Sequence, residues 1–330
     1  MYFYSIALLG SPLEPFSYHS ENLLSIGTEV EVTLSNRAVH GVVIGQCEKP
    51  DFKTSLIVSC SDFYYSDSQI KTAQFMCDYY GCSLGEALNL FVPFPVVPNS
   101  IGDPVFLSDG DGFPIKSGMT IDITLSEPQT QALNFIRSHN VSLLFGDTGA
   151  GKSEIYMRRM DEILSEGKRC LLLLPEISLT PQMEKRFKNH FGEAVVLWHS
   201  KMTPKQKKVT LEKIYDGSAY IVVGPRSALF LPIKDLGLVV VDEEHDESYK
   251  SSSRPRYNAR DMAVYIGNIL KIPVVLGSAT PSLSSYAKYP FFRLRGGYFN
   301  SQRSFVFESS IEALTPSIDA KVMENYASAH

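Results

Sequence analysis

The sequence predicts an α/β protein with a parallel, doubly wound sheet, preceded by a smaller β-rich domain. Two observations lead to this prediction. After residue 125, short apolar segments alternate with helical ones, which is typical of buried parallel strands covered by helices. Before residue 92, apolar and polar residues alternate, as in strands with one buried face. A length of 330 residues suits about two domains.

The first domain, residues 1–92, is expected to contain strands near 2–9, 29–34 and 40–45. The hydrophobic period then changes over 68–91, where Gly81 divides two helical stretches. These residues therefore predict a small β structure with a helical end.

Residues 93–124 are rich in proline and glycine and are predicted as a linker with room for a hairpin. Residues 125–290 form the main α/β domain, and 291–330 a connector toward a further domain, with a helix expected over 318–330. Strands of the main domain are predicted at 141–145, 170–174, 194–198, 220–223, 238–241 and 273–277.

Composition excludes several classes of protein. The longest aliphatic runs, 171–174 and 238–241, have four residues, whereas a membrane span needs roughly 20. The N-terminus has no basic region of the kind that begins a secretory signal. The odd number of cysteines, five, gives no disulfide framework and favours a reducing cytoplasm.

The net charge of −5 hides an asymmetry between the two parts. Residues 1–125 hold 5 Lys and Arg against 14 Asp and Glu, a balance of −9, and residues 126–330 hold 26 against 22, a balance of +4. A polyanion should therefore favour the second part. The acidic balance of the first part should weaken long contacts with phosphate backbones.

The strongest motif is a complete G-x-x-x-x-G-K-[ST] match between a predicted strand and a predicted helix. Backbone N–H groups of such a loop surround phosphate oxygens, and the helix N-terminus adds positive potential. Lys152 would reach the β- and γ-phosphates, and the Ser153 hydroxyl would hold Mg²⁺. The loop consists of Gly146, Asp147, Thr148, Gly149, Ala150, Gly151, Lys152 and Ser153.

A second motif, D-E-E-H, follows the apolar strand at 238–241. An acidic cluster after a strand is often only a solvated loop. In a P-loop protein, however, Asp242 at this strand end can hold Mg²⁺ opposite Ser153, and Glu243 can orient and deprotonate the attacking water. The candidate catalytic residues are therefore Lys152, Asp242 and Glu243.

A third motif, S-A-T, again follows an apolar strand and contains Ser278 and Thr280. The order P-loop, D-E-x-H and S-A-T resembles that of superfamily 2 helicases, in which S-A-T couples nucleotide state to strand movement. The resemblance implies a RecA-like motor lobe that binds ATP and Mg²⁺.

Longer blocks resemble one helicase family, the bacterial replication-restart helicases called primosomal protein N′, or PriA. The blocks cover nearly all of 125–290, and the segment at 125–129 resembles the family's Q-motif, which makes Gln129 the candidate reader of adenine. The region around 14–18 resembles, more weakly, the family's domain that binds DNA 3′ ends. The blocks are LPEISLTPQ at 174–182, HS at 199–200, GPRSALF at 224–230, DEEHD at 242–246, SYK at 248–250 and RYNARDMAVY at 256–265.

The resemblance implies an ATP-driven 3′→5′ DNA helicase that recognises stalled or abandoned forks and assembles the primosome. Implied partners are forked and single-stranded DNA, single-strand-binding protein and the proteins that load the replicative helicase, in the bacterial cytoplasm near the nucleoid. The loop 249–257 resembles an aromatic-rich loop that couples single-stranded DNA to ATP hydrolysis. Candidate DNA-binding or coupling residues are Phe16, Lys53, Arg226, Arg254, Arg256, Tyr257, Arg260, Ser278 and Thr280.

The chain also departs from the family pattern. Ser17 replaces an aspartate of the 3′-end pocket, Pro225 a hydroxyl residue, and Pro255 a common tryptophan. The second motor lobe, with its arginine finger and paired zinc cysteines, is not in the chain, so zinc is expected only there. Two other readings stay open: a DNA-end-binding module without catalysis, and a DNA-dependent ATPase or translocase that does not unwind.

Overall fold

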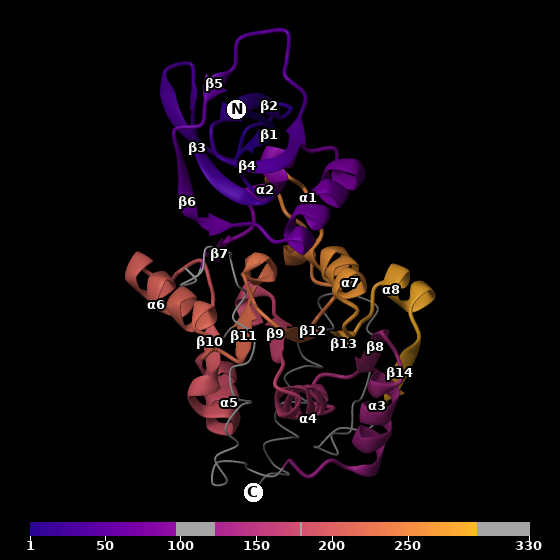
Figure 1. Cartoon of the computed structure of the whole chain (residues 1–330). Coiled ribbons are helices and arrows are strands. Elements are labelled where there is room, and N and C mark those ends of the chain that lie inside the picture. Colours follow the sequence, from indigo (N-terminus) through magenta and orange to yellow (C-terminus); the bar gives the residue numbers. More distant parts are fainter. Residues whose placement is uncertain (97–122, 179, 296–330) are drawn as a thin grey trace, which may run out of the picture.

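The computed structural model describes residues 1–96, 123–178 and 180–295, which form a small β-rich domain and a larger α/β domain (Figure 1). The expected fold class is confirmed, because the larger domain is built on a parallel sheet and the smaller one is mainly antiparallel.

The N-terminal sheet has the strand order β5-β2-β1-β4-β3-β6-β7. Residues of the segment 57–58 donate hydrogen bonds to both β2 and β3, which are not neighbours in the sheet, so the sheet curls on itself. Its strands are β1 (Tyr2–Leu8), β2 (Phe16–Ser20), β3 (Thr28–Leu34), β4 (Arg37–Cys47), β5 (Ser55–Leu56), β6 (Ser59–Tyr64) and β7 (Phe94–Pro95).

Two helices, α1 (Asp67–Tyr80) and α2 (Leu84–Leu88), complete this domain as predicted, and Gly81 divides them. Each begins with a capping box, Ser66 with Gln69 and Ser83 with Glu86. The alternation of the strands separates two faces. Residues such as Tyr4 and Val30 fill the inside of the curled sheet, whereas Ala7 and Val42 pack under the helices.

The second sheet has the order β10-β11-β9-β12-β13-β8-β14, and every neighbouring pair is parallel. The strands are β8 (Val141–Gly146), β9 (Arg169–Leu173), β10 (Val195–Leu197), β11 (Ile221–Gly224), β12 (Leu236–Val241), β13 (Val274–Ser278) and β14 (Phe291–Leu294). The helices are α3 (Glu127–Arg137), α4 (Lys152–Ser165), α5 (Pro181–Phe191), α6 (Pro204–Tyr215), α7 (Ala259–Leu270) and α8 (Leu283–Lys288).

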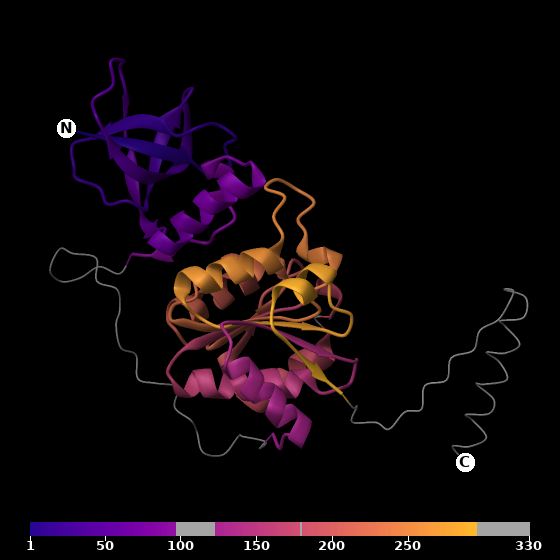
Figure 2. The same ribbon diagram turned by 90° about the vertical axis from the view of Figure 1, so that its right-hand side faces the viewer.

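Helices cover both faces of this sheet, with α3, α4 and α5 on one side and α6 and α7 on the other (Figure 2). Successive side chains of a strand point to opposite faces of the sheet and so pack against different helices. On β12, Leu238 and Val240 pack against the first set of helices, whereas Val239 and Val241 pack against the second. The uniform apolar run therefore reflects burial on both faces.

Two boundaries differ from the sequence prediction. The range 291–330 was expected to be a connector, but it begins with β14, which pairs with β8 at the edge of the parallel sheet. The linker range 93–124 likewise begins with β7, which pairs with β6. Both strands are too short to produce a readable hydrophobic pattern. Nearly all of the remaining linker range and the helix expected over 318–330 lie outside the described residues.

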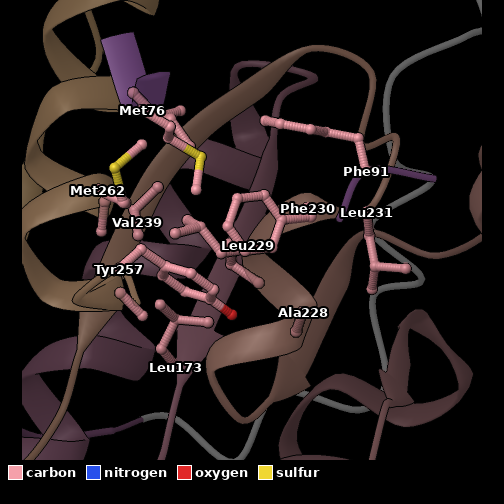
Figure 3. Close-up of a cluster of buried hydrophobic side chains, with 14 of the residues drawn as sticks. Met76, Phe91, Leu173, Ala228, Leu229, Phe230, Leu231, Val239, Tyr257 and Met262 are labelled. Atoms are coloured by element: carbon pink, nitrogen blue, oxygen red, sulfur yellow. The ribbon is translucent and has the colours of Figure 1, made fainter. Parts of the chain in front are cut away.

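The two domains share one buried cluster (Figure 3). Met76 of α1 and Phe91 after α2 pack beside Phe230 and Met262 of the α/β domain, and the rings of Phe91 and Phe230 meet edge to face at 4.8 Å. The Val92 N–H also donates to the Phe230 carbonyl oxygen at 3.0 Å. The N-terminal domain is therefore docked on the α/β domain by apolar contacts. Within the described residues, no helix has the length and apolar character needed to cross a membrane.

Candidate active site

The loop after β8 has the geometry that phosphate binding needs. Gly149 and Gly151 adopt positive φ angles of 81° and 86°, which turn the chain into the first residue of α4, Lys152. The Lys152 side chain is 7% exposed, and its Nζ donates to the Gly146 carbonyl oxygen at 2.7 Å. This ammonium group is thus held across the loop, where a phosphate would meet it.

Gln129, the candidate adenine reader, lies in the first turn of α3. Its Oε1 accepts the Ser126 N–H at 2.8 Å as part of a capping box, and its Nε2 donates to the Gly151 carbonyl oxygen at 3.3 Å. A Cβ at Gly151 would collide with this amide. The structure therefore places Gln129 against the phosphate-binding loop, where it ties α3 to that loop.

Asp242 directly follows β12 and is 9% exposed. The Tyr156 hydroxyl, from α4, donates to Asp242 Oδ1 at 2.9 Å, and the Tyr249 hydroxyl donates to the Asp242 carbonyl oxygen at 2.6 Å. Burial, and next the charge of Glu243, raise the pKa of the Asp242 carboxyl above its usual range. Hydrogen bonds therefore hold both the side chain and the backbone carbonyl of Asp242 in place.

The D-E-E-H and S-A-T motifs are joined by direct contacts. The Ser278 hydroxyl lies 2.7 Å from His245 Nδ1, and the Thr280 hydroxyl lies 3.2 Å from His245 Nε2. Glu243, with an uncommon positive φ of 47°, lies 3.6 Å from His245 Nδ1 through its Oε2. These contacts link the candidate water-activating carboxylate to the end of β13.

Glu244, which the sequence did not single out, is the centre of a buried network. Its carboxylate, 0% exposed, accepts from Arg260 Nη1 at 3.1 Å and from the Ser282 N–H at 2.7 Å. The Ser285 hydroxyl donates to it at 2.8 Å. Arg260 also pairs with Asp261. Arg260 was expected to bind DNA or to couple it to ATP hydrolysis; in the structure its guanidinium joins α7 to Glu244 of D-E-E-H and to Ser282, which follows S-A-T.

The loop 249–257 is fixed at its base. Arg226 Nη1 donates to the carbonyl oxygens of Ser248 and Lys250, each at 2.8 Å, and the buried Tyr249 reaches Asp242. Arg226 thus holds the start of the loop, a positioning role that the family resemblance did not describe.

The burial of Tyr257 differs from what the sequence predicted. Its side chain was expected to be available for base stacking, but the residue is 4% exposed and packs edge to face on Phe230 at 5.1 Å. Burial raises its pKa to about 12. A base cannot stack on a ring that is buried in this way. Arg254 and Arg256, in contrast, are exposed, and Arg254 Nη2 donates to the Gly81 carbonyl oxygen of the N-terminal domain at 3.3 Å.

The two residues expected in a 3′-end pocket lie on neighbouring segments. Phe16 begins β2 and is partly buried, and Lys53 is exposed in the chain that leads into β5. The next residue, Thr54, contacts His19 of β2 at 2.7 Å between its hydroxyl and His19 Nδ1. The structure therefore brings both candidates to one edge of the N-terminal sheet.

A cleft at the carboxyl ends of β8 and β12 joins the candidate residues of the α/β domain. Ser153 and Asp242 line this cleft together and offer the hard oxygen donors that Mg²⁺ prefers. Its other lining residues are Asp147, Thr148, Gly149, Gly151, Lys152, Glu154, Arg186 and Glu243. No cluster of three or more His, Cys, Asp or Glu side chains suits a metal ion in the described ranges.

Comparison with known proteins identifies the families that the two domains match. Residues 126–289 match the DEAD/DEAH box helicase family, and residues 5–93 match the 3′DNA-binding domain family. The chain is 43% identical over 321 residues to the replication restart protein PriA of Helicobacter pylori, which covers 96% of the chain and 50% of the relative. The chain belongs to the PriA family. It spans about half the length of the curated PriA relatives it matches most fully.

PriA of Bacillus subtilis is 44% identical over 175 residues, which cover 51% of the chain and 22% of that relative. Among solved structures, RecG bound to a three-way DNA junction matches with a TM-score of 0.46 at 18% identity, covering 61% of the chain and 28% of RecG. The PriA family thus accounts for both domains. It does not by itself assign Tyr156, Tyr249 or Glu244. The motifs did not reveal these roles because each depends on a partner outside the residue's own motif, namely Asp242 for the two tyrosines and Arg260 for Glu244.

Proposed function

We propose that this chain is the DNA-end-binding and ATP-binding part of an ATP-driven 3′→5′ DNA helicase that restarts replication at stalled or abandoned forks. The observation that carries the proposal is the shared cleft of Lys152, Ser153, Asp242 and Glu243. It combines a cation for phosphates, two oxygen donors and a carboxylate next to the donors. This is the set of groups that phosphoryl transfer to water requires.

In this proposal each side chain has one task. Lys152 holds the β- and γ-phosphates, and Glu243 orients and deprotonates the attacking water. Ser153 and Asp242 would hold Mg²⁺, which when bound supplies neutralisation of the phosphate charge. Gln129, which lies against the phosphate-binding loop, would recognise the adenine of the nucleotide.

The route to DNA runs through the contacts between the motifs and the loop 249–257. Tyr249 joins the loop to Asp242, and His245 joins Glu243 to Ser278 and Thr280. Arg254 and Arg256 would contact phosphates at the exposed end of the loop, while Phe16 and Lys53 would hold a 3′ end. Partners at the fork would be single-strand-binding protein and the proteins that load the replicative helicase, in the bacterial cytoplasm near the nucleoid.

Charge in the transition state develops on both sides of the γ-phosphate, and we infer that a second lobe supplies the other side. We therefore expect this chain to bind ATP and Mg²⁺ but to hydrolyse ATP roughly 10³-fold more slowly than a complete two-lobed helicase. Zinc would belong to that second lobe.

The test is steady-state ATP hydrolysis by the chain, with and without forked DNA that carries a 3′ leading-strand end. Slow hydrolysis that DNA stimulates, and that Glu243→Gln abolishes, would support the proposal. Glu243→Gln is the matched control because it keeps the size of the side chain and removes the base.

Two results would contradict parts of the proposal. No binding of ATP in the presence of Mg²⁺ would remove the helicase assignment for this lobe. Binding of ATP and of DNA ends without any turnover would favour a DNA-end-binding module. Strand-separation assays distinguish a helicase from a translocase that does not unwind.

A further inference from the structure

Tyr156 is a buried polar residue that no motif of the site includes. It lies on α4, three residues after Ser153, so the two side chains share one face of the helix. Tyr156 is 0% exposed, and its hydroxyl donates to Asp242 Oδ1 at 2.9 Å across 86 residues of sequence. A hydroxyl at such a position must have a partner, and the partner here is the candidate Mg²⁺ ligand.

The neighbouring strand leaves room for this contact. Gly277 on β13 has no side chain, and a Cβ built there would collide with the Tyr156 hydroxyl oxygen and lie 2.8 Å from Asp242 Oδ1. The apolar strand therefore carries a glycine where the hydroxyl and the carboxylate meet. Three elements, α4, β12 and β13, thus contribute to one hydrogen bond.

We propose that Tyr156 is a positioning residue for Mg²⁺: its hydroxyl holds one oxygen of Asp242 and thereby fixes the orientation in which the carboxylate faces the cleft. The inference rests on the proposed function and extends it by one residue. Groups that hydrogen-bond to metal ligands typically change metal affinity 10- to 100-fold when they are removed.

A phenylalanine at this position would keep the ring and remove the donor. In a site this buried, water cannot enter readily to replace the hydroxyl, so Asp242 would lose a fixed orientation. The loss should affect metal binding much more than the binding of the nucleotide alone, because the Tyr156 hydroxyl bonds to Asp242, whereas the Lys152 ammonium group bonds to the Gly146 carbonyl oxygen.

The experiment uses the full chain and a fluorescent ADP analogue. Its affinity is measured first in EDTA and then while Mg²⁺ is added, and Mn²⁺ binding is followed in parallel by electron paramagnetic resonance. For Tyr156→Phe we expect an unchanged affinity in EDTA and a rise of about tenfold in the half-saturating Mg²⁺ and Mn²⁺ concentrations.

Tyr4→Phe is the matched control, because Tyr4 is 1% exposed, its hydroxyl accepts the Leu24 N–H at 2.8 Å, and it lies in the other domain. This variant loses a comparable buried hydroxyl and should bind both metals like the parent chain. Asp242→Asn serves as the reference for loss of the metal ligand itself.

Gly277→Ala gives a second, independent route. It should displace the hydroxyl and weaken metal binding at least as much as Tyr156→Phe does. In the double variant, removal of the hydroxyl relieves the collision, so the unfolding temperature should recover in part while metal affinity stays low.

The outcomes separate the two claims. If the parent chain binds the nucleotide with Mg²⁺ and Tyr156→Phe binds both metals equally well, the positioning role is overturned and the proposed function stands. The same conclusion follows if Tyr156→Phe only lowers the unfolding temperature. If the parent chain shows no Mg²⁺-dependent nucleotide binding, the proposed function fails together with the positioning role.

Discussion

The described residues form two sheets of seven strands each, and the two sheets present candidate functional residues in different ways. In the α/β domain, β12, β13 and β8 are neighbours, and all point the same way. The loops that follow them carry the three motifs, so these loops meet at one edge of the sheet. In the N-terminal domain, Phe16 and Lys53 come from a strand and from the chain before another strand, with no shared motif.

This difference explains why short sequence motifs predict the cleft of the α/β domain, whereas no such motif predicts where Phe16 and Lys53 lie. A parallel sheet concentrates the ends of its strands at one edge, so a short motif after each strand is enough to build a site. The curled N-terminal sheet gathers residues through its pairing, as when the Ile57 N–H bonds to the His19 carbonyl oxygen. The four predictions below test this contrast, from the largest expected effect to the smallest.

The largest effect is expected from Lys152→Ala, which removes the cation of the phosphate-binding loop. ATP affinity should fall at least about 100-fold, because a buried charge-assisted contact to phosphate is lost. Binding of a DNA 3′ end should change by less than about twofold, because the residues proposed for that site lie on the other sheet. Titrations with a fluorescent ATP analogue and with a labelled 3′-end oligonucleotide check both results. A parallel loss of DNA-end binding would contradict the separation of the two sites.

The second prediction concerns how independent the two domains are. A Cβ at Gly85 would overlap the Leu8 carbonyl oxygen, so Gly85→Ala should destabilise the chain by about 3 kcal/mol. Because one apolar cluster spans both domains, we expect a single, shifted unfolding transition in calorimetry. Gly45→Ala is the control, since nothing lies within 4 Å of its Cβ, and it should change stability by at most about 0.5 kcal/mol. Two separate transitions would show that the domains fold independently.

The third prediction concerns how much the buried, ionised carboxylate of Asp242 lowers the free energy of unfolding. The folded chain raises the pKa of Asp242 through burial and the charge of Glu243, so the ionised carboxylate destabilises the folded state at pH 7. Asp242→Asn should therefore raise the free energy of unfolding by roughly 1 kcal/mol, measured by urea denaturation without Mg²⁺.

The sign of the pH dependence follows from the raised pKa. As pH falls through the raised pKa, the parent chain takes up a proton on Asp242 and recovers this free energy. The stability difference between Asp242→Asn and the parent should thus shrink on acidification. A variant that is less stable than the parent at pH 7 would contradict the argument.

The smallest effect is expected at the polar contact between the domains. Arg254 lies 3.5 Å from Glu86 between Nε and Oε1, and its side chain is 63% exposed, so Arg254→Ala should cost less than about 1 kcal/mol of stability. We expect affinity for single-stranded DNA to fall a few-fold and its salt dependence to weaken by about one phosphate contact. Glu86→Gln is the matched control, because it breaks the same ion pair and keeps the cation. Equal DNA affinity in both variants would make Arg254 only a structural residue.

Much of the fold of both domains was predictable because its signals are local. Strand segments, the helix break at Gly81 and the three motifs each depend on residues close together in the sequence. The roles of Tyr257 and Arg260 could not be predicted in this way. An aromatic ring and a cation in this segment suit DNA contacts, yet Tyr257 is buried against Phe230 and Arg260 is paired with Glu244.

The sequence alone determined that the chain has a parallel α/β domain with a phosphate-binding loop, because hydrophobic period and glycine spacing act over short distances. Only the tertiary structure decided which carboxylates line the cleft and which are buried away from it. Asp242 lies with Tyr156 and the cleft, whereas Glu244, two residues later, is sequestered by Arg260 and serines. The physical reason is that burial and hydrogen-bond partners come from elements 16 to 86 residues away, and no short pattern records which of them will meet.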